Sequence, residues 1–180
     1  MSSNNKIKVL CADDECIINE WEKRFKKFFS PDFEFVWTQY SNQVLPLLDK
    51  QNDFDVVILD LEFKGQDMQG KDVLVQIGNS KFSDIPVIIF TVDDSPKTFL
   101  EISGLSDKKP YDYIIKHDID YDDASQLLRF AADPKAINPN FLKGDSDNIR
   151  NVKKMIKLFA EADQEKNAPT VLILGDTGTG

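Results

Sequence analysis

The chain has 180 residues, room for one full domain and part of another, and 41% of them are apolar, which is ordinary for a globular core. Its net charge of −9, with no basic block, argues against nonspecific binding to nucleic acid or to an anionic membrane surface. No apolar run approaches the roughly 20 residues that span a bilayer, and residues 1–5 lack a signal-peptide pattern, so we expect a cytoplasmic protein.

The cysteine and histidine content limits the metal and catalytic chemistry. Cys11 lies in an apolar stretch and Cys16 at the start of a predicted helix, without further Cys or His residues at a metal-like spacing. We interpret both as reduced, buried thiols. His117 is the only histidine, which leaves little material for a His-based catalytic dyad or a multi-His metal site.

The first half of the chain alternates predicted strands and helices. Residues 6–12 form an apolar strand that ends on Asp13-Asp14-Glu15. An amphipathic helix follows, and its apolar positions recur every three or four residues: Ile17, Ile18, Trp21, Phe25, Phe28 and Phe29. After a strand at residues 33–38, Ser41 is the predicted N-cap of a second helix, in which Pro46 indicates a late start or a kink.

The second half continues the alternation. Residues 55–59 are rich in β-branched side chains, which is typical of a strand buried on both faces, and the strand ends on Asp60. A glycine-containing loop then leads to a short helix that ends near Gly78. A strand at residues 86–90 ends on Thr91, and the next predicted helix begins at Ser95-Pro96, carries Phe99, Leu100 and Ile102, and ends near Gly104. A strand at residues 111–115 ends on Lys116, and the last helix ends at Asp133-Pro134.

This alternation predicts an α/β fold. We expect a doubly wound, five-stranded parallel sheet with helices on both faces and right-handed crossovers. The carboxyl ends of parallel strands share one edge of the sheet, where ligands bind. The polar groups at four strand ends should therefore converge: Asp13 with Asp14, Asp60, Thr91 and Lys116. Each alone is a weak signal in a chain with 31 acidic residues, but their coincidence on successive strand ends indicates a site.

These residue types favour phosphoryl chemistry. Clustered carboxylates repel one another, and a hard cation such as Mg²⁺, which prefers oxygen ligands, relieves that repulsion. Asp60 could then act as a nucleophile on phosphorus and become an aspartyl-phosphate. The Lys116 ammonium can neutralise the phosphoryl oxygens together with Mg²⁺, and the Thr91 hydroxyl can hydrogen-bond one of them.

The same residues resemble the pattern of CheY-like receiver domains of response regulators. The resemblance covers about residues 6–133 and includes Tyr113, which stands at the aromatic switch position of the family. It implies strand order 2-1-3-4-5, for which CheY is the standard example, and phosphorylation of Asp60 by a sensor histidine kinase.

The resemblance also implies roles for individual residues. Asp14, Asp60 and the backbone carbonyl of Glu62 would ligate Mg²⁺ directly, and Asp13 would act through water. Phosphorylation would draw Thr91 and Tyr113 inward and shift the surface of the fourth helix, fifth strand and fifth helix, a contact for a second protomer in a homodimer or for the output domain. We expect no enzyme activity beyond the chain's own phosphorylation and dephosphorylation.

Several positions depart from the family pattern. His117 stands where proline usually follows the lysine, which puts the usual cis peptide in doubt, and Val92 stands where a small residue is usual. The loop after Asp60 looks about two residues longer than usual. Glu62 and Asp93 lie where the family tunes the lifetime of the aspartyl-phosphate, and two exposed loop acids are an equal alternative.

The departures keep other functions open. One is a pseudo-receiver, an interaction module with the same fold that is not phosphorylated in use. Another is a hydrolase of the haloacid-dehalogenase type, which also uses a nucleophilic Asp. That family has a second Asp two residues after the nucleophile, where this chain has Glu62, so it is strongly disfavoured.

The last part of the chain suggests a second domain. We expect a receiver domain at residues 1–133, a linker at 134–145, and a partial helix and strand at 146–180. The strand leads into a glycine-rich loop that fits the first part of a Walker A motif: Gly175, Asp176, Thr177, Gly178, Thr179 and Gly180. The segment resembles the opening of the AAA+ ATPase domain of sigma-54-dependent activators. A glycine-rich flexible terminus is the alternative, and without the motif's lysine we expect no ATP hydrolysis.

Overall fold

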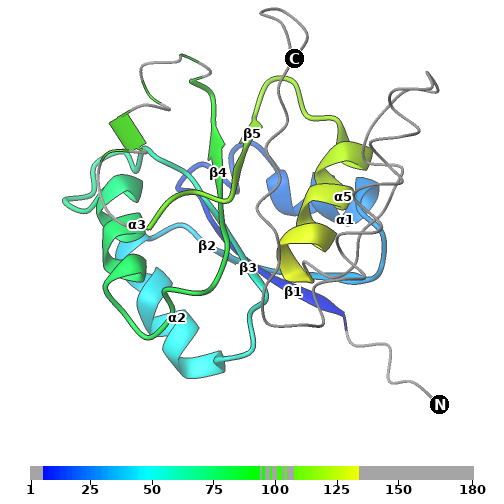
Figure 1. Cartoon of the computed structure of the whole chain (residues 1–180). Coiled ribbons are helices and arrows are strands. Elements are labelled where there is room, and N and C mark those ends of the chain that lie inside the picture. The colour runs from blue at the N-terminus through cyan, green and yellow to red at the C-terminus, as the bar shows by residue number, and fades with distance from the viewer. Residues whose placement is uncertain are drawn as a thin grey trace, which may run out of the picture. The chain divides into compact units, whose positions relative to one another are not determined.

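The computed structural model describes residues 6–133, except 94, 96–97, 99–100, 103 and 105–107. Within this part, all strands belong to one five-stranded parallel sheet in the order β2-β1-β3-β4-β5 (Figure 1). The predicted fold class and strand order are therefore confirmed. The predicted linker and the partial domain at 146–180 lie outside the described residues, as do Phe99 and Leu100 of the predicted fourth helix.

The elements follow the predicted alternation. Their bounds are β1 (Ile7–Ala12), α1 (Trp21–Phe28), β2 (Phe33–Thr38), a 3₁₀ helix (Ser41–Gln43), α2 (Val44–Gln51), β3 (Val56–Leu59), α3 (Gly70–Gly78), β4 (Val87–Thr91), β5 (Asp112–Ile115) and α5 (Tyr121–Ala132). Among the described residues, no helix has both the length and the apolar character to cross a membrane.

The sheet is covered by helices on both faces. Figure 1 shows α1 and α5 on one side of the sheet and α2 and α3 on the other. Every residue of β3 and β4 is buried, and their side chains alternate between two apolar clusters. One cluster includes Phe25 of α1 and Leu128 of α5; the other includes Leu48 of α2 and Leu74 of α3. Burial on both faces explains why these strands are continuous apolar runs.

The predicted start of the first helix was wrong. Residues 14–20 form turns, α1 begins only at Trp21, and Ile17 and Ile18 expose 70% and 77% of their surfaces. Glu20 has a left-handed backbone with φ of 53°, which interrupts any helix that would begin earlier. The helical spacing of the two isoleucines was therefore misleading.

The predicted N-cap of the second helix was also wrong. Ser41 begins the 3₁₀ helix, and α2 starts at Val44 without a side-chain cap. The Ser41 hydroxyl instead donates to the Met68 carbonyl at 2.7 Å and to Gln66 Oε1 at 3.1 Å, both in the loop between β3 and α3. The late helix start that Pro46 indicated is confirmed, since Pro46 lies in the first turn of α2.

Candidate functional site

Four strand ends meet at the carboxyl edge of the sheet, held by hydrogen bonds that continue the strand ladders. The Asp60 N–H donates to the Ala12 carbonyl at 2.9 Å, and the Lys116 N–H donates to the Thr91 carbonyl at 2.8 Å. The Asp13 N–H donates to the Thr38 carbonyl at 3.0 Å. Backbone hydrogen bonds thus fix the Cα positions of Asp13, Asp60 and Lys116.

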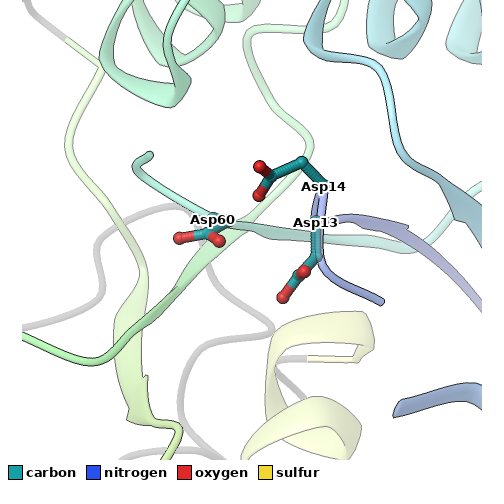
Figure 2. A group of neighbouring side chains, drawn as sticks. All are labelled: Asp13, Asp14 and Asp60. Carbon is teal, nitrogen blue, oxygen red and sulfur yellow. The ribbon is translucent and has the colours of Figure 1, made fainter. Parts of the chain in front are cut away.

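Asp13, Asp14 and Asp60 form an acidic cluster in which one carboxylate oxygen from each lies within 4.8 Å of the others (Figure 2). Asp13 exposes 1% and Asp60 6% of its surface, while Asp14 is partly exposed. Figure 2 shows the cluster coming from the end of β1 and the residue after β3. Buried carboxylates require a cationic partner, because an isolated buried charge is very costly.

Lys116 supplies the cation within the protein. Its Nζ lies 2.8 Å from Asp13 Oδ2 and also forms an ion pair and hydrogen bond with Asp60 Oδ2. The lysine side chain exposes only 7% of its surface, and its Nζ lies 5.1 Å from the centroid of the Phe90 ring. One ammonium therefore bridges two carboxylates in a largely water-excluded place.

Burial shifts the pKa values of these groups. Desolvation raises the pKa of Asp60 to about 6, against the lowering effect of Lys116, and the nearby Asp13 charge adds to the rise. Desolvation likewise raises the pKa of Asp13 above its usual value. Burial alone would lower the pKa of Lys116, but the two carboxylates outweigh it and the pKa is raised. The ammonium therefore stays charged at neutral pH.

The cluster has the composition of a divalent-cation site. Three ionised carboxylates and one ammonium sum to −2, which a divalent cation would neutralise. All candidate ligand atoms are oxygens, the type that Mg²⁺ prefers.

The sequence matches the response regulator receiver domain family over residues 9–120. The chain belongs to this family. A comparison with curated proteins finds no match.

Solved structures show the same fold at low sequence identity. The receiver domain of Francisella response regulator 1452 is 21% identical, with a TM-score of 0.57, covering 72% of this chain and 98% of its own. The Vibrio cholerae chemotaxis protein CheY4 is 19% identical, with a TM-score of 0.57, covering 70% of this chain and 98% of its own. The NtrX receiver domain of Brucella abortus is 18% identical, with a TM-score of 0.57, covering 69% of this chain and 97% of its own.

The remaining predicted residues of the receiver domain lie on β4, on β5 and just after β3. Thr91 is buried at the end of β4, and its Oγ1 accepts the Asp93 N–H at 3.1 Å. Tyr113 lies on β5 opposite Ile89. Its side chain is partly buried and packs against the apolar cluster that contains Leu48 of α2 and Leu74 of α3. The exposed Glu62 donates its N–H to Asp60 Oδ1 at 3.4 Å; ligation by its carbonyl stays a prediction.

Two departures from the family pattern have a clear structural outcome. Val92 exposes 63% of its surface, so its side chain extends toward solvent. No peptide bond among the described residues is cis, so the bond from Lys116 to the exposed His117 is trans. Lys116 nevertheless reaches both Asp13 and Asp60.

The contacts that orient Asp14 were hardly predictable from the amino-acid sequence. Its Oδ2 accepts the backbone N–H of Lys64 at 2.8 Å, and its backbone carbonyl accepts Gln39 Nε2 at 3.2 Å. The Lys64 ammonium also pairs with Glu15. Outer hydrogen bonds of this kind fix the orientation of metal-ligating carboxylates. The unusual length of the loop after Asp60, which contains Lys64, was a sequence signal for the first of these contacts.

Because the pKa of Asp60 is raised, replacing its carboxyl group by a neutral amide should raise the free energy of unfolding by an amount that depends on pH. Below pH 3.8, the pKa of an unperturbed Asp, the carboxyl is protonated in both the folded and the unfolded protein. Between pH 3.8 and about 6 the unfolded protein loses this proton while the folded protein retains it, so the free energy of unfolding falls as the pH rises through this range. Without divalent cations, we expect Asp60→Asn to raise the free energy of unfolding at pH 8 by about 1–3 kcal/mol, and by about 1–2 kcal/mol less at pH 5. Urea denaturation in EDTA at both pH values measures this; an equal difference at both would contradict it.

Proposed function

We propose that this receiver domain accepts a phosphoryl group on Asp60 in the presence of Mg²⁺. The observation that carries the proposal is the buried bridge from Lys116 to Asp13 and Asp60, beside the partly exposed Asp14. A structural ion pair would need one carboxylate, whereas this ammonium bridges two and a third, Asp14, lies in the same acidic cluster. Such an excess of negative charge is costly unless a cation binds there in use.

Asp60 is placed to act as the nucleophile. A carboxylate oxygen would attack the donor phosphorus, forming a new P–O bond, while the bond from phosphorus to the leaving group breaks and its electron pair leaves with that group. Oδ1 is the better candidate, because its hydrogen bond from Glu62 is long at 3.4 Å, whereas Oδ2 is paired with Lys116. The pKa of about 6 keeps most of the Asp60 population ionised at neutral pH.

The surrounding residues would stabilise the transferred group. Lys116 would exchange its bond to Asp60 Oδ2 for a phosphoryl oxygen, and the Thr91 hydroxyl would donate to another oxygen. Asp13, Asp14 and Asp60, with the Glu62 carbonyl, would hold Mg²⁺, which supplies neutralising charge to the phosphoryl oxygens when bound. Asp13 already accepts the Glu15 N–H through Oδ1 at 2.8 Å, which orients it for a role through water.

The remaining roles follow from the family resemblance. The donor would be the phosphohistidine of a sensor histidine kinase, in the cytoplasm. The output would be an AAA+ ATPase domain, because residues 146–180 resemble the opening of such a domain. A linker at residues 134–145 would join it to the receiver domain. Phosphorylation would change the surface around β5 and α5 through Thr91 and Tyr113, where the output domain or a second copy of the chain would bind.

We expect incubation with acetyl phosphate and Mg²⁺ to add one phosphoryl group to the protein, and Asp60→Asn to abolish the adduct. Intact mass spectrometry measures it, with EDTA in place of Mg²⁺ as a second negative control. Asp55→Asn is the matched control: it makes the same substitution just before β3, at the strand's opposite end, where Asp55 accepts the Lys8 N–H at 2.8 Å.

Asp55→Asn should be labelled like the wild-type chain. If the folded wild-type protein binds Mg²⁺ but forms no adduct, phosphorylation is contradicted and a pseudo-receiver becomes the better interpretation. The exposed Val92 and His117 would then be the first positions to change toward the family pattern.

A further inference from the structure

The segment after β4 contains a hydrogen-bonded chain that begins at Thr91. Thr91 Oγ1 accepts the Asp93 N–H at 3.1 Å, and the Asp93 carboxylate accepts two further hydrogen bonds. The Ser95 N–H donates to Asp93 Oδ1 at 2.9 Å, and the Thr98 hydroxyl donates to Asp93 Oδ2. We call these contacts among Thr91, Asp93, Ser95 and Thr98 the Asp93 clamp.

The clamp orders the beginning of the next helical segment. Ser95 Oγ accepts the Thr98 N–H at 3.3 Å, as the predicted N-cap should, and Asp93 holds both residues from outside the helix. The hydrogen bond from Thr98 is the main reason that the pKa of Asp93 is lowered, with those from Ser95 next. The carboxylate is thus turned toward Ser95 and Thr98 and engaged there as an anion.

The same segment is anchored elsewhere. Ile102 is fully buried in the cluster that also contains Leu74 of α3. Glu101 pairs with Lys71 of α3 at 3.1 Å. The segment therefore has apolar and ionic anchors to α3 near Ile102, and the Asp93 clamp at its beginning. Weakening the clamp would free the beginning while Ile102 stays packed.

The first member of the clamp also belongs to the candidate site. Thr91 is 3% exposed and lies at the carboxyl end of β4, one strand from Asp60. A rotation about χ1 that turned its hydroxyl toward a phosphoryl group on Asp60 would move Oγ1 from one staggered position to another. Such a rotation would take the acceptor oxygen away from the Asp93 N–H.

We propose that Asp93 is a positioning residue that couples the orientation of the Thr91 hydroxyl to the ordering of Ser95 and Thr98. When Thr91 turns toward the phosphorylated Asp60, Asp93 loses its backbone anchor, and its carboxylate releases the beginning of the segment. This role rests on the proposed phosphorylation of Asp60. It differs from tuning the lifetime of the phosphate, because the Asp93 carboxylate is engaged with Ser95 and Thr98.

Amide hydrogen exchange at Thr98 and Ile102, followed residue by residue by NMR on the full chain, tests the proposal. In the unphosphorylated protein, we expect Asp93→Ala to speed exchange at Thr98 about fivefold, the change expected for one net hydrogen bond, and to change exchange at Ile102 less than twofold. Thr98→Val, which removes only the hydroxyl, should have the same effect, and Thr98→Ser should restore the wild-type rate.

Phosphorylation tests the coupling itself. With acetyl phosphate and Mg²⁺, exchange at Thr98 should rise about fivefold in the wild-type chain and less than twofold in Asp93→Ala, where the clamp is already open. Asp120→Ala is the matched control: Asp120 accepts the N–H groups of Asp122 and Asp123 at the start of α5, so its loss should leave exchange at Thr98 unchanged.

Two results would overturn the proposal. Unphosphorylated Asp93→Ala with wild-type exchange at Thr98 would show that there is no clamp. An equal rise on phosphorylation in the wild type and in Asp93→Ala would show that the signal bypasses Asp93. Intact mass, measured on the same samples, separates the two hypotheses: absence of an adduct in the wild type contradicts the proposed function and the coupling, while the unphosphorylated comparison still decides whether Asp93 holds Thr98.

Discussion

Replacing Lys116 by Met should destabilise the cation-free protein by about 3–5 kcal/mol at pH 8, because it leaves Asp13 and Asp60 buried without their ammonium partner. Methionine keeps most of the volume beside Phe90, so loss of charge rather than loss of packing dominates. Chemical denaturation in EDTA gives the free energy of unfolding.

Magnesium should recover much of this loss. Removing the ammonium changes the formal charge of the site from −2 to −3, so we expect saturating Mg²⁺ to raise the free energy of unfolding more in Lys116→Met than in the wild-type chain. Lys64→Met is the control, since its ion pair with Glu15 is largely exposed and should contribute under about 1 kcal/mol. A loss of less than about 1 kcal/mol in Lys116→Met, or equal gains from Mg²⁺, would contradict the electrostatic account of the site.

Gly70→Ala should displace the peptide that carries Asp60. A Cβ on Gly70 would lie 1.8 Å from the Asp60 carbonyl oxygen and 2.8 Å from Leu61 Cα, both backbone atoms that cannot swing aside. The Gly70 N–H also donates to the Leu61 carbonyl at 3.0 Å, which holds the first turn of α3 against this peptide. We expect a loss of about 2–3 kcal/mol in the free energy of unfolding, at the upper part of the range for overpacking.

The displacement should also reduce chemistry at Asp60. Because the side chain begins at the shifted peptide, we expect labelling by acetyl phosphate and Mg²⁺ to slow at least tenfold in protein that remains folded, as misplacement by about 1 Å does in other sites. Gly104→Ala is the matched control, since a Cβ there would have no atom within 4 Å. Near wild-type stability and labelling in Gly70→Ala would show that the backbone at Asp60 yields without cost.

The sheet could be predicted from the sequence because its strands have strong local signals. The strands β3 and β4 are buried on both faces, and only a short continuous run of apolar residues satisfies both faces at once. Alternation with helical segments then leaves a parallel sheet as the simplest arrangement, and parallel strands place their carboxyl ends together. The proximity of Asp13, Asp14 and Asp60 follows from that topology.

Details between the elements were less predictable. Ile17 and Ile18 precede Trp21 by four and three residues, which is a helical spacing, but the left-handed backbone of Glu20 delays the start of α1. The periodicity of apolar residues carries no information about a single dihedral angle. Ser41 has the right residue type for an N-cap, yet its hydroxyl donates to Met68 and Gln66, more than twenty residues away in the sequence. Local propensity gives way when a distant partner is available.

The amino-acid sequence alone thus determined the fold class, the strand order suggested by family resemblance, and which polar groups stand at strand ends. Those properties depend on local apolar patterns and on the order of strands and helices, and both can be read from the order of the residues. Three properties depend on the folded arrangement: the bridge from Lys116 to Asp13 and Asp60, the rise in the pKa of Asp60, and the close approach of Gly70 to the Asp60 carbonyl. Burial and distance between residues far apart in the chain set these properties, and neither exists before the chain folds.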